Sequence, residues 1–118
     1  MANSSYMFIK DSGKKALAWV NFSAQGALNV RESFNVNSGT DQGVGKYRIN
    51  FKTPMEHSDY CVVGTASIHY GSDNISIVSH ITSLSLRSLH KNYVEIMAAS
   101  TQNNEFDPTT VTLVIFGD

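Results

Sequence analysis

The sequence predicts an all-β fold, an antiparallel β-sandwich of jelly-roll type with about eight strands. Three observations predict this fold class. Short segments alternate apolar and polar side chains with a period of two, which is typical of half-buried strands. Glycine, asparagine, aspartate and serine separate these segments at regular intervals, as turns do. No segment has the apolar spacing of an amphipathic helix. The 118 residues are therefore expected to form one domain, residues 1–118.

The beginning of the chain contains one clear strand. Residues 1–13 are polar and are expected to be a partly loose lead-in, with a short apolar segment at 6–9 that suits an edge strand. Residues 16–22 form the strand, and Leu17 and Trp19 point away from its other side chains. Both sets of side chains are apolar. We therefore expect burial on both faces, or one face in the core and one in a subunit interface.

The next part of the chain contains two further strands and a turn. Residues 27–36 are expected to form one strand, with a bulge near Arg31. Residues 37–45 contain three glycines with Asn, Ser and Asp, and are predicted to be turn throughout. Residues 46–52 show the strictest alternation in the chain. Their apolar members are expected to face the core: Tyr47, Ile49 and Phe51.

The second half of the chain predicts five more strands. Residues 60–69 and 75–81 form a hairpin around a Gly-Ser-Asp-Asn turn. In residues 83–89 the spacing of leucines slips from two to three, which fits either a strand with a bulge or a short helical turn. Residues 93–99 and 111–116 complete the set, separated by a polar loop that contains a proline.

Composition narrows the functional classes. Charged residues make up 16% of the chain and the net charge is −1, so no nucleic-acid binding is expected. No apolar run reaches the ~18 residues of a membrane span, and no membrane insertion is expected. The single cysteine, Cys61, excludes an intrachain disulfide and a cysteine-based zinc site. Its apolar neighbours predict a small buried side chain.

The sequence contains no motif for catalysis, a cofactor or a metal. The histidines His57, His69, His80 and His90 lack the spacing of ligand pairs. Two arrangements could still bring histidines together to hold a metal. His69 and His80 are expected near the ends of two consecutive strands, where they can approach one another across a sheet. In a trimer, one histidine from each chain could meet near the three-fold axis. Nucleophile and phosphate-loop motifs are absent, so we expect no enzyme, no cofactor and no metal.

Two regions are candidates for ligand binding. Lys46, Arg48 and Lys52 form a basic stripe, which fits an ordinary solvated strand face or a contact with acidic polysaccharide. The other candidates lie in predicted loops, where an aromatic ring beside amides suits stacking and hydrogen bonding to sugars. These loop residues are Tyr70, Asp73, Asn74, Gln102, Asn103, Asn104 and Phe106.

Residues 15–60 contain several short segments in a recognisable order: KALAWVNF, then SFNV, then TDQGVGKYRINFKTPM and an Asp-Tyr pair. With the closing VTLVIFG at 111–117, this order resembles the C-terminal domain of tail-fibre and appendage proteins of marine tailed bacteriophages, including cyanophages. The segment 67–108 shows no such resemblance. The matching segments are expected strands and turns, so they indicate a family and a fold but no catalytic mechanism.

The resemblance implies a homotrimer packed around a three-fold axis. The expected interface is formed by a second apolar face that comprises Ala18, Val20, Phe22, Val114 and Phe116. The implied function is a virion tip, assembled in the bacterial host cytoplasm with other virion proteins, that binds host-cell polysaccharide or lipopolysaccharide. Two alternatives remain at this point: a structural or decoration knob that recognises nothing, and a carbohydrate-degrading enzyme.

Overall fold

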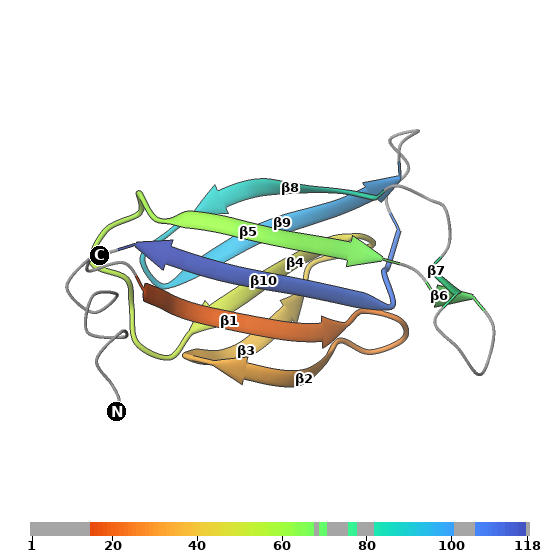
Figure 1. Ribbon diagram of the computed structural model, residues 1–118, viewed down its shortest axis with the longest axis horizontal. Coiled ribbons are helices and arrows are strands. Elements are labelled where there is room, and N and C mark those ends of the chain that lie inside the picture. The colour runs from red at the N-terminus through yellow and green to blue at the C-terminus, as the bar shows by residue number, and fades with distance from the viewer. Residues whose placement is uncertain (1–14, 68, 71–75, 78–81, 101–105, 118) are drawn as a thin grey trace, which may run out of the picture.

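The computed structural model describes residues 15–67, 69–70, 76–77, 82–100 and 106–117, and confirms the predicted β-sandwich (Figure 1). This part of the chain contains ten strands, β1 to β10, and no helix. Eight strands form two four-stranded antiparallel sheets, one behind the other in Figure 1. The two remaining strands are short and pair only with each other, at one end of the sandwich.

We call the two large sheets sheet A and sheet B. Sheet A has the order β2-β1-β10-β5, and its strands are β1 (Lys15–Ser23), β2 (Asn29–Phe34), β5 (Cys61–Ser67) and β10 (Thr110–Gly117). Sheet B has the order β3-β4-β9-β8, and its strands are β3 (Val36–Asp41), β4 (Lys46–Phe51), β8 (Thr82–Leu89) and β9 (Tyr93–Ser100). The short pair is β6 (His69–Tyr70) and β7 (Ser76–Ile77).

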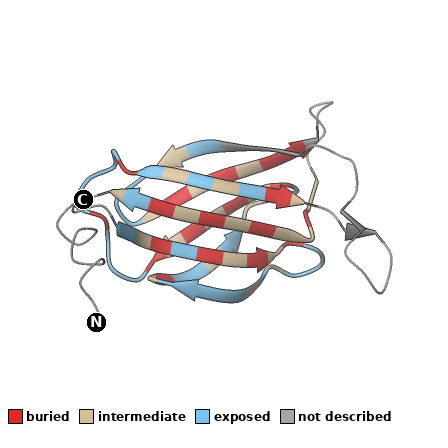
Figure 2. Ribbon diagram, in the orientation of Figure 1, coloured by how far each residue is buried: buried red, intermediate tan, exposed pale blue. Residues whose placement is uncertain are grey.

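The core lies between the two sheets and takes every second residue of the inner strands β1, β10, β4 and β9, visible as alternating bands in Figure 2. In β4 the predicted inward residues Tyr47, Ile49 and Phe51 are all buried. The ring of Phe22 in sheet A meets that of Tyr47 in sheet B edge-on, with centroids 5.5 Å apart. An edge-to-face pair of this kind adds about 0.5–1.5 kcal/mol beyond the apolar area that it buries.

Tyr47 also forms the main polar contact of the core. Its hydroxyl donates to Oδ1 of Asp107 at 2.5 Å, and the same oxygen accepts the Gly45 N–H at 2.9 Å. Burial raises the pKa of Tyr47 far above its ordinary value, and the hydrogen bond to Asp107 raises it further. The hydroxyl therefore remains a neutral donor that ties the segment before β10 to the start of β4.

The structure reverses the predicted faces of β1. Ala18, Val20 and Phe22, expected at a trimer interface, are at most 1% exposed and belong to the core of a single chain. Trp19 lies on the outer face instead, opposite Val114 of β10. The prediction was wrong because both faces of this strand are apolar, and alternation alone does not show which face meets the other sheet. Of the expected interface residues, only Val114 and Phe116 face outward.

The chain passes from sheet A to sheet B at Asn35, so residues 27–36 are not one continuous strand. Asn35 has a φ of 56°, a left-handed conformation that asparagine tolerates better than most residues. Its amide donates to the carbonyls of Leu17 and Thr53, both at 3.1 Å, and accepts the Thr53 N–H at 2.7 Å. These bonds hold the corner in place.

The predicted turn at 37–45 is mostly strand. β3 pairs with β4 along its length, and only residues 42–45 turn the chain, with positive φ at Gly43 and Gly45. The prediction was wrong because β3 is an edge strand with a polar outer face, so it lacks the apolar alternation of a buried strand.

Two predicted irregularities are confirmed by the strand register. Asn21 pairs with Glu32 and the next residue, Phe22, pairs with Val30, so Arg31 is the bulged residue of β2. In β8 the register shifts between Leu86 and Ser88, which makes residues 83–89 a strand with a bulge rather than a helical turn. Each bulge leaves an arginine outside the regular pairing, Arg31 in one case and Arg87 in the other.

Cys61 is exposed, contrary to the prediction of a buried side chain. In β5 the inward residues are Val62 and Ala66, and Cys61 lies on the outer face opposite Phe116 of β10. As in β1, an apolar run on both faces of the strand conceals which residues enter the core.

Candidate functional site

The outer face of sheet B carries a row of polar side chains that crosses all four strands. Thr40 in β3 lies opposite Arg48 in β4, Arg48 lies opposite Glu95 in β9, and Glu95 lies opposite Ser88 in β8. We call these four residues the polar row. Alternation places them on the outer face, because their strand neighbours such as Ile49 and Ile96 fill the core.

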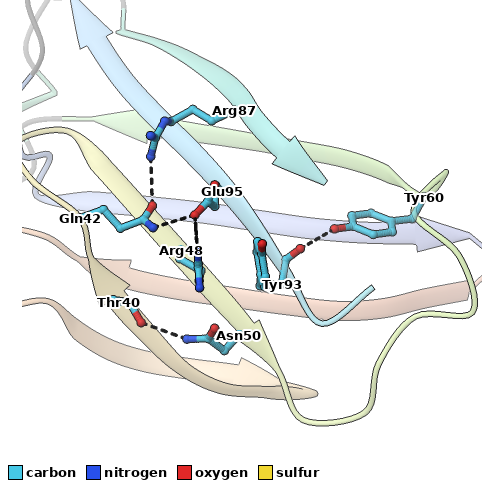
Figure 3. A network of polar contacts seen from close by, with 8 residues as sticks. All are labelled: Thr40, Gln42, Arg48, Asn50, Tyr60, Arg87, Tyr93 and Glu95. Carbon is cyan, nitrogen blue, oxygen red and sulfur yellow. Dashed lines mark hydrogen bonds and ion pairs between the residues drawn. The ribbon is translucent and has the colours of Figure 1, made fainter. Parts of the chain in front are cut away.

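Glu95 is the centre of a hydrogen-bond network on this face (Figure 3). Its Oε2 atom accepts Nε and Nη2 of Arg48 at 3.0 and 2.8 Å, and Nε2 of Gln42 at 2.6 Å. Nη1 of Arg87 donates to Oε1 of Gln42 at 3.0 Å. The Gln42 hydrogen bond, followed by the Arg48 contact, holds the pKa of Glu95 below its ordinary value. Glu95 therefore stays ionised at neutral pH.

The network leaves some polar atoms without partners. All the hydrogen bonds to the Glu95 carboxylate end on Oε2, and its Oε1 accepts none from the residues that the structure describes. Arg48 uses Nε and Nη2, and its Nη1 has no bonded partner in the same part of the chain. One acceptor and one donor thus remain unused on the outer face of sheet B.

A stack of three planar groups lies beside the polar row. The guanidinium of Arg48 lies 4.0 Å from the centroid of the Tyr93 ring. The His90 ring stacks on the same tyrosine with centroids 4.5 Å apart and an angle of 5°. Two planar groups at these distances must occupy opposite faces of the ring. Tyr93 therefore has no free face, and the outer face of His90 ends the stack.

Tyr60 holds the turn that carries this stack. Its hydroxyl lies 2.8 Å from the His90 carbonyl and 2.9 Å from that of Tyr93, and accepts the His90 N–H at 3.1 Å. Its ring is buried against Phe51, edge-on, with centroids 5.8 Å apart. Burial raises the pKa of Tyr60, so the hydroxyl remains a neutral donor. The turn between β8 and β9 is thus fixed from inside the core.

Next to the polar row, Asn50 joins β4 to β3. Its Nδ2 donates to the hydroxyls of Ser38 and Thr40, both at 3.1 Å. Its Oδ1 accepts no hydrogen bond from the described residues, so it adds a second unused acceptor to this face. Asn50, Ser38 and Thr40 form a separate cluster, because no side-chain hydrogen bond between described residues joins them to the network around Glu95.

Part of the outer face of sheet A is apolar, beside polar residues such as Asn21 and Thr112. Phe34 in β2 lies opposite Trp19 in β1, Trp19 opposite Val114 in β10, and Val114 opposite Val63 in β5. We call these four residues the apolar row. Phe34 is 51% exposed, Trp19 37% and Val63 59%. Phe116, 39% exposed, adjoins this row on β10.

Most of the predicted loop residues fall outside the described part of the chain: Asp73, Asn74, Gln102, Asn103 and Asn104. His80 lies outside it as well. Tyr70 belongs to β6, and His69 precedes it there; their side chains are not described. Phe106 is half-buried and packs against the core, which corrects its assignment as an exposed stacking residue. The Phe106 ring lies against the core because the Phe106 N–H bonds to the carbonyl of Ala98, whose strand borders the core.

The predicted basic stripe is not a uniform positive surface. Arg48 is paired with Glu95, and Lys52 lies beyond the end of β4. His57 accepts the Asp59 N–H through Nδ1 in an exposed loop. The described residues contain no group of three or more histidine, cysteine or acidic side chains that is placed to hold a metal ion.

Comparisons with known proteins add no relative. No family model matches the chain, and no match was found among curated proteins or solved structures. Within the described residues, no helix is long and apolar enough to span a membrane.

Proposed function

We propose that this protein is the trimeric tip of a bacteriophage tail fibre or surface appendage, and that it attaches the virion to carbohydrate on the host cell. The supporting observation is the contrast between the two outer faces of the sandwich. Sheet A carries an exposed apolar row that suits packing against other subunits, and sheet B offers a polar face that suits a hydrated ligand. The resemblance of residues 15–60 to phage fibre tips supports the same assignment.

The apolar row favours association between copies of the chain. β5 and β10 contain no charged residue, and charges are depleted at the centre of protein interfaces. Four strands about 4.8 Å apart and some eight residues long present roughly 500 Å² in projection. This area covers the whole outer face, polar residues such as Asn21 and Thr112 included, and is about 60% of the ~800 Å² that each partner buries in a stable interface. Three such faces around an axis would cover the exposed aromatic rings.

The polar row favours binding rather than catalysis. Sugar hydroxyls pair well with the planar amide, carboxylate and guanidinium groups that this face presents. A glycosidase needs one carboxylic acid that is still protonated at working pH, facing a second carboxylate. Glu95 is ionised by its partners and has no second carboxylate among its described contacts, so it fits recognition better than acid catalysis.

The alternative function is a structural knob that trimerises and binds no receptor. The apolar row supports this reading equally well, because it requires only subunit packing. The polar row distinguishes the two functions. A knob needs no unused donors and acceptors on sheet B, whereas a receptor-binding tip does.

Two measurements test the proposal. Light scattering after size-exclusion chromatography should give three times the chain mass, and a monomer at micromolar concentration would contradict the trimeric tip. The purified trimer should also bind susceptible cells and reduce phage adsorption when added in excess. Trimer formation without adsorption to any susceptible cell would favour the structural knob.

A further inference from the structure

We infer that the polar row is a sugar-binding site, and that it recognises two adjacent hydroxyl groups of an uncharged sugar. This inference rests on the proposed function in one respect, that the ligand is a carbohydrate. It differs from the sequence prediction in location, because it places the site on the face of sheet B rather than in the loops.

The unused atoms of the row determine which ligand fits. Oε1 of Glu95 is an ionised acceptor, so it requires a ligand group that donates a hydrogen. Nη1 of Arg48 is a pure donor, so it requires an oxygen that accepts. Two neighbouring hydroxyls satisfy both needs, because one donates to Glu95 while the other accepts from Arg48. An isolated carboxylate has no hydrogen to donate, so it satisfies Arg48 but not Glu95.

The charges of the row favour an uncharged ligand. The guanidinium of Arg48 is already compensated by the Glu95 carboxylate at 2.8 Å. An acidic sugar that approached Arg48 would therefore meet the negative charge of Glu95 beside it, while Arg87, the other cation of the network, is bonded to the opposite end of the Gln42 amide. Charge-assisted hydrogen bonds to neutral hydroxyls are available without this repulsion.

The site is held in its binding geometry before a ligand arrives. Gln42 fixes the Glu95 carboxylate from one side and accepts from Arg87 on its other side. Arg48 is fixed by two hydrogen bonds and by the Tyr93 ring. Side chains that are already ordered lose little rotamer freedom on binding, which favours affinity.

The test is a titration of the ¹⁵N-labelled full chain with single sugars, followed by two-dimensional NMR. Methyl mannoside and methyl galactoside should shift the amide signals of β4 and β9 around Arg48 and Glu95. Deoxy analogues that lack one of two adjacent hydroxyls should bind about tenfold more weakly, the loss expected for one charge-assisted hydrogen bond. Glucuronate and inorganic phosphate should bind more weakly than the neutral sugars.

A pair of matched variants removes the same charge from the two faces. Glu95→Gln should weaken binding of the neutral sugar by about tenfold or more. Glu32→Gln, which changes an exposed carboxylate on sheet A, should leave binding unchanged. The deoxy analogues need no variant, so the test holds even where Glu95→Gln fails to fold.

The results separate this inference from the proposed function. Sugar-induced shifts confined to other residues would overturn the site while leaving carbohydrate attachment in place. Tighter binding of glucuronate or phosphate at these amides would overturn the uncharged ligand. Adsorption to host cells with no sugar-induced shift in β4 or β9 would also refute the site, and no adsorption at all would refute the proposed function itself.

Discussion

Replacing Tyr47 with phenylalanine removes one buried oxygen atom and keeps the ring. The ring contact with Phe22 remains, and so does the bond from the Gly45 N–H to Asp107. The lost interaction is the 2.5 Å hydrogen bond to the Asp107 carboxylate. Hydrogen bonds to charged groups contribute about 1.5–3 kcal/mol to stability. We expect the free energy of unfolding at pH 7 to fall by this amount.

The same substitution should also change how steeply the free energy of unfolding falls at alkaline pH. The folded protein keeps the Tyr47 proton at a pH where an unfolded tyrosine, with an ordinary pKa of 10.0, releases it. The contribution of the protonated Tyr47 to the free energy of unfolding is therefore complete below pH 10. Above pH 10 this contribution decreases by about 1.4 kcal/mol for each pH unit. Tyr47→Phe removes this contribution, so the variant should lose stability less steeply than the wild type above pH 10.

Urea unfolding followed by far-ultraviolet circular dichroism measures both effects. Protein concentration must be equal throughout, because the proposed trimer would make the measured stability depend on concentration. Tyr93→Phe is the matched control, since the Tyr93 hydroxyl has no bonded partner among the described residues, and it should change stability by less than about 0.5 kcal/mol. A Tyr47→Phe variant as stable as this control, with the same alkaline slope as the wild type, would refute the role assigned to the Tyr47–Asp107 pair.

Three further outcomes follow from the same structure. Trp19→Asp should place a charge at the centre of the apolar row and convert the trimer to a monomer in light scattering, and an intact trimer would exclude this face as the interface. Cys61, which lies on the same face as Phe116, should react with maleimide faster in the Trp19→Asp monomer than in the wild type; equal rates would place the interface elsewhere. Asn35→Ala should lower the unfolding free energy by about 2 kcal/mol, because it removes the side-chain bonds of a left-handed corner, and a change below about 0.5 kcal/mol would show that the backbone alone holds the corner.

The sequence predicted the parts of the fold that depend on neighbouring residues. The alternation in β4 identified Tyr47, Ile49 and Phe51 as core residues, and the slip in leucine spacing in β8 allowed for a bulge. It failed where a strand has two similar faces. In β1 and β5 both faces are apolar, so the choice between core and surface depends on the opposite sheet, which local patterns do not contain.

The candidate site depended on contacts that no local pattern contains. Arg48 was recognised as part of a basic stripe, but its partner Glu95 follows 47 residues later and meets it only through the register of β4 and β9. Gln42 was hidden in a segment that predicted only a turn. Residues 93–99 were predicted only as a strand, and the period of two that would place Tyr93 and Glu95 on one face of it was not used.

The pairing of the first and last described strands determines how the domain responds to force. β1 and β10 are antiparallel neighbours, and Lys15 at the start of one lies opposite Gly117 at the end of the other. A pull that separated these two ends would break the hydrogen bonds between the strands one at a time, as in a zipper, instead of loading them together. The sandwich is therefore mechanically weak in that direction. A force applied to only one of the two ends would not pull these strands apart in this way.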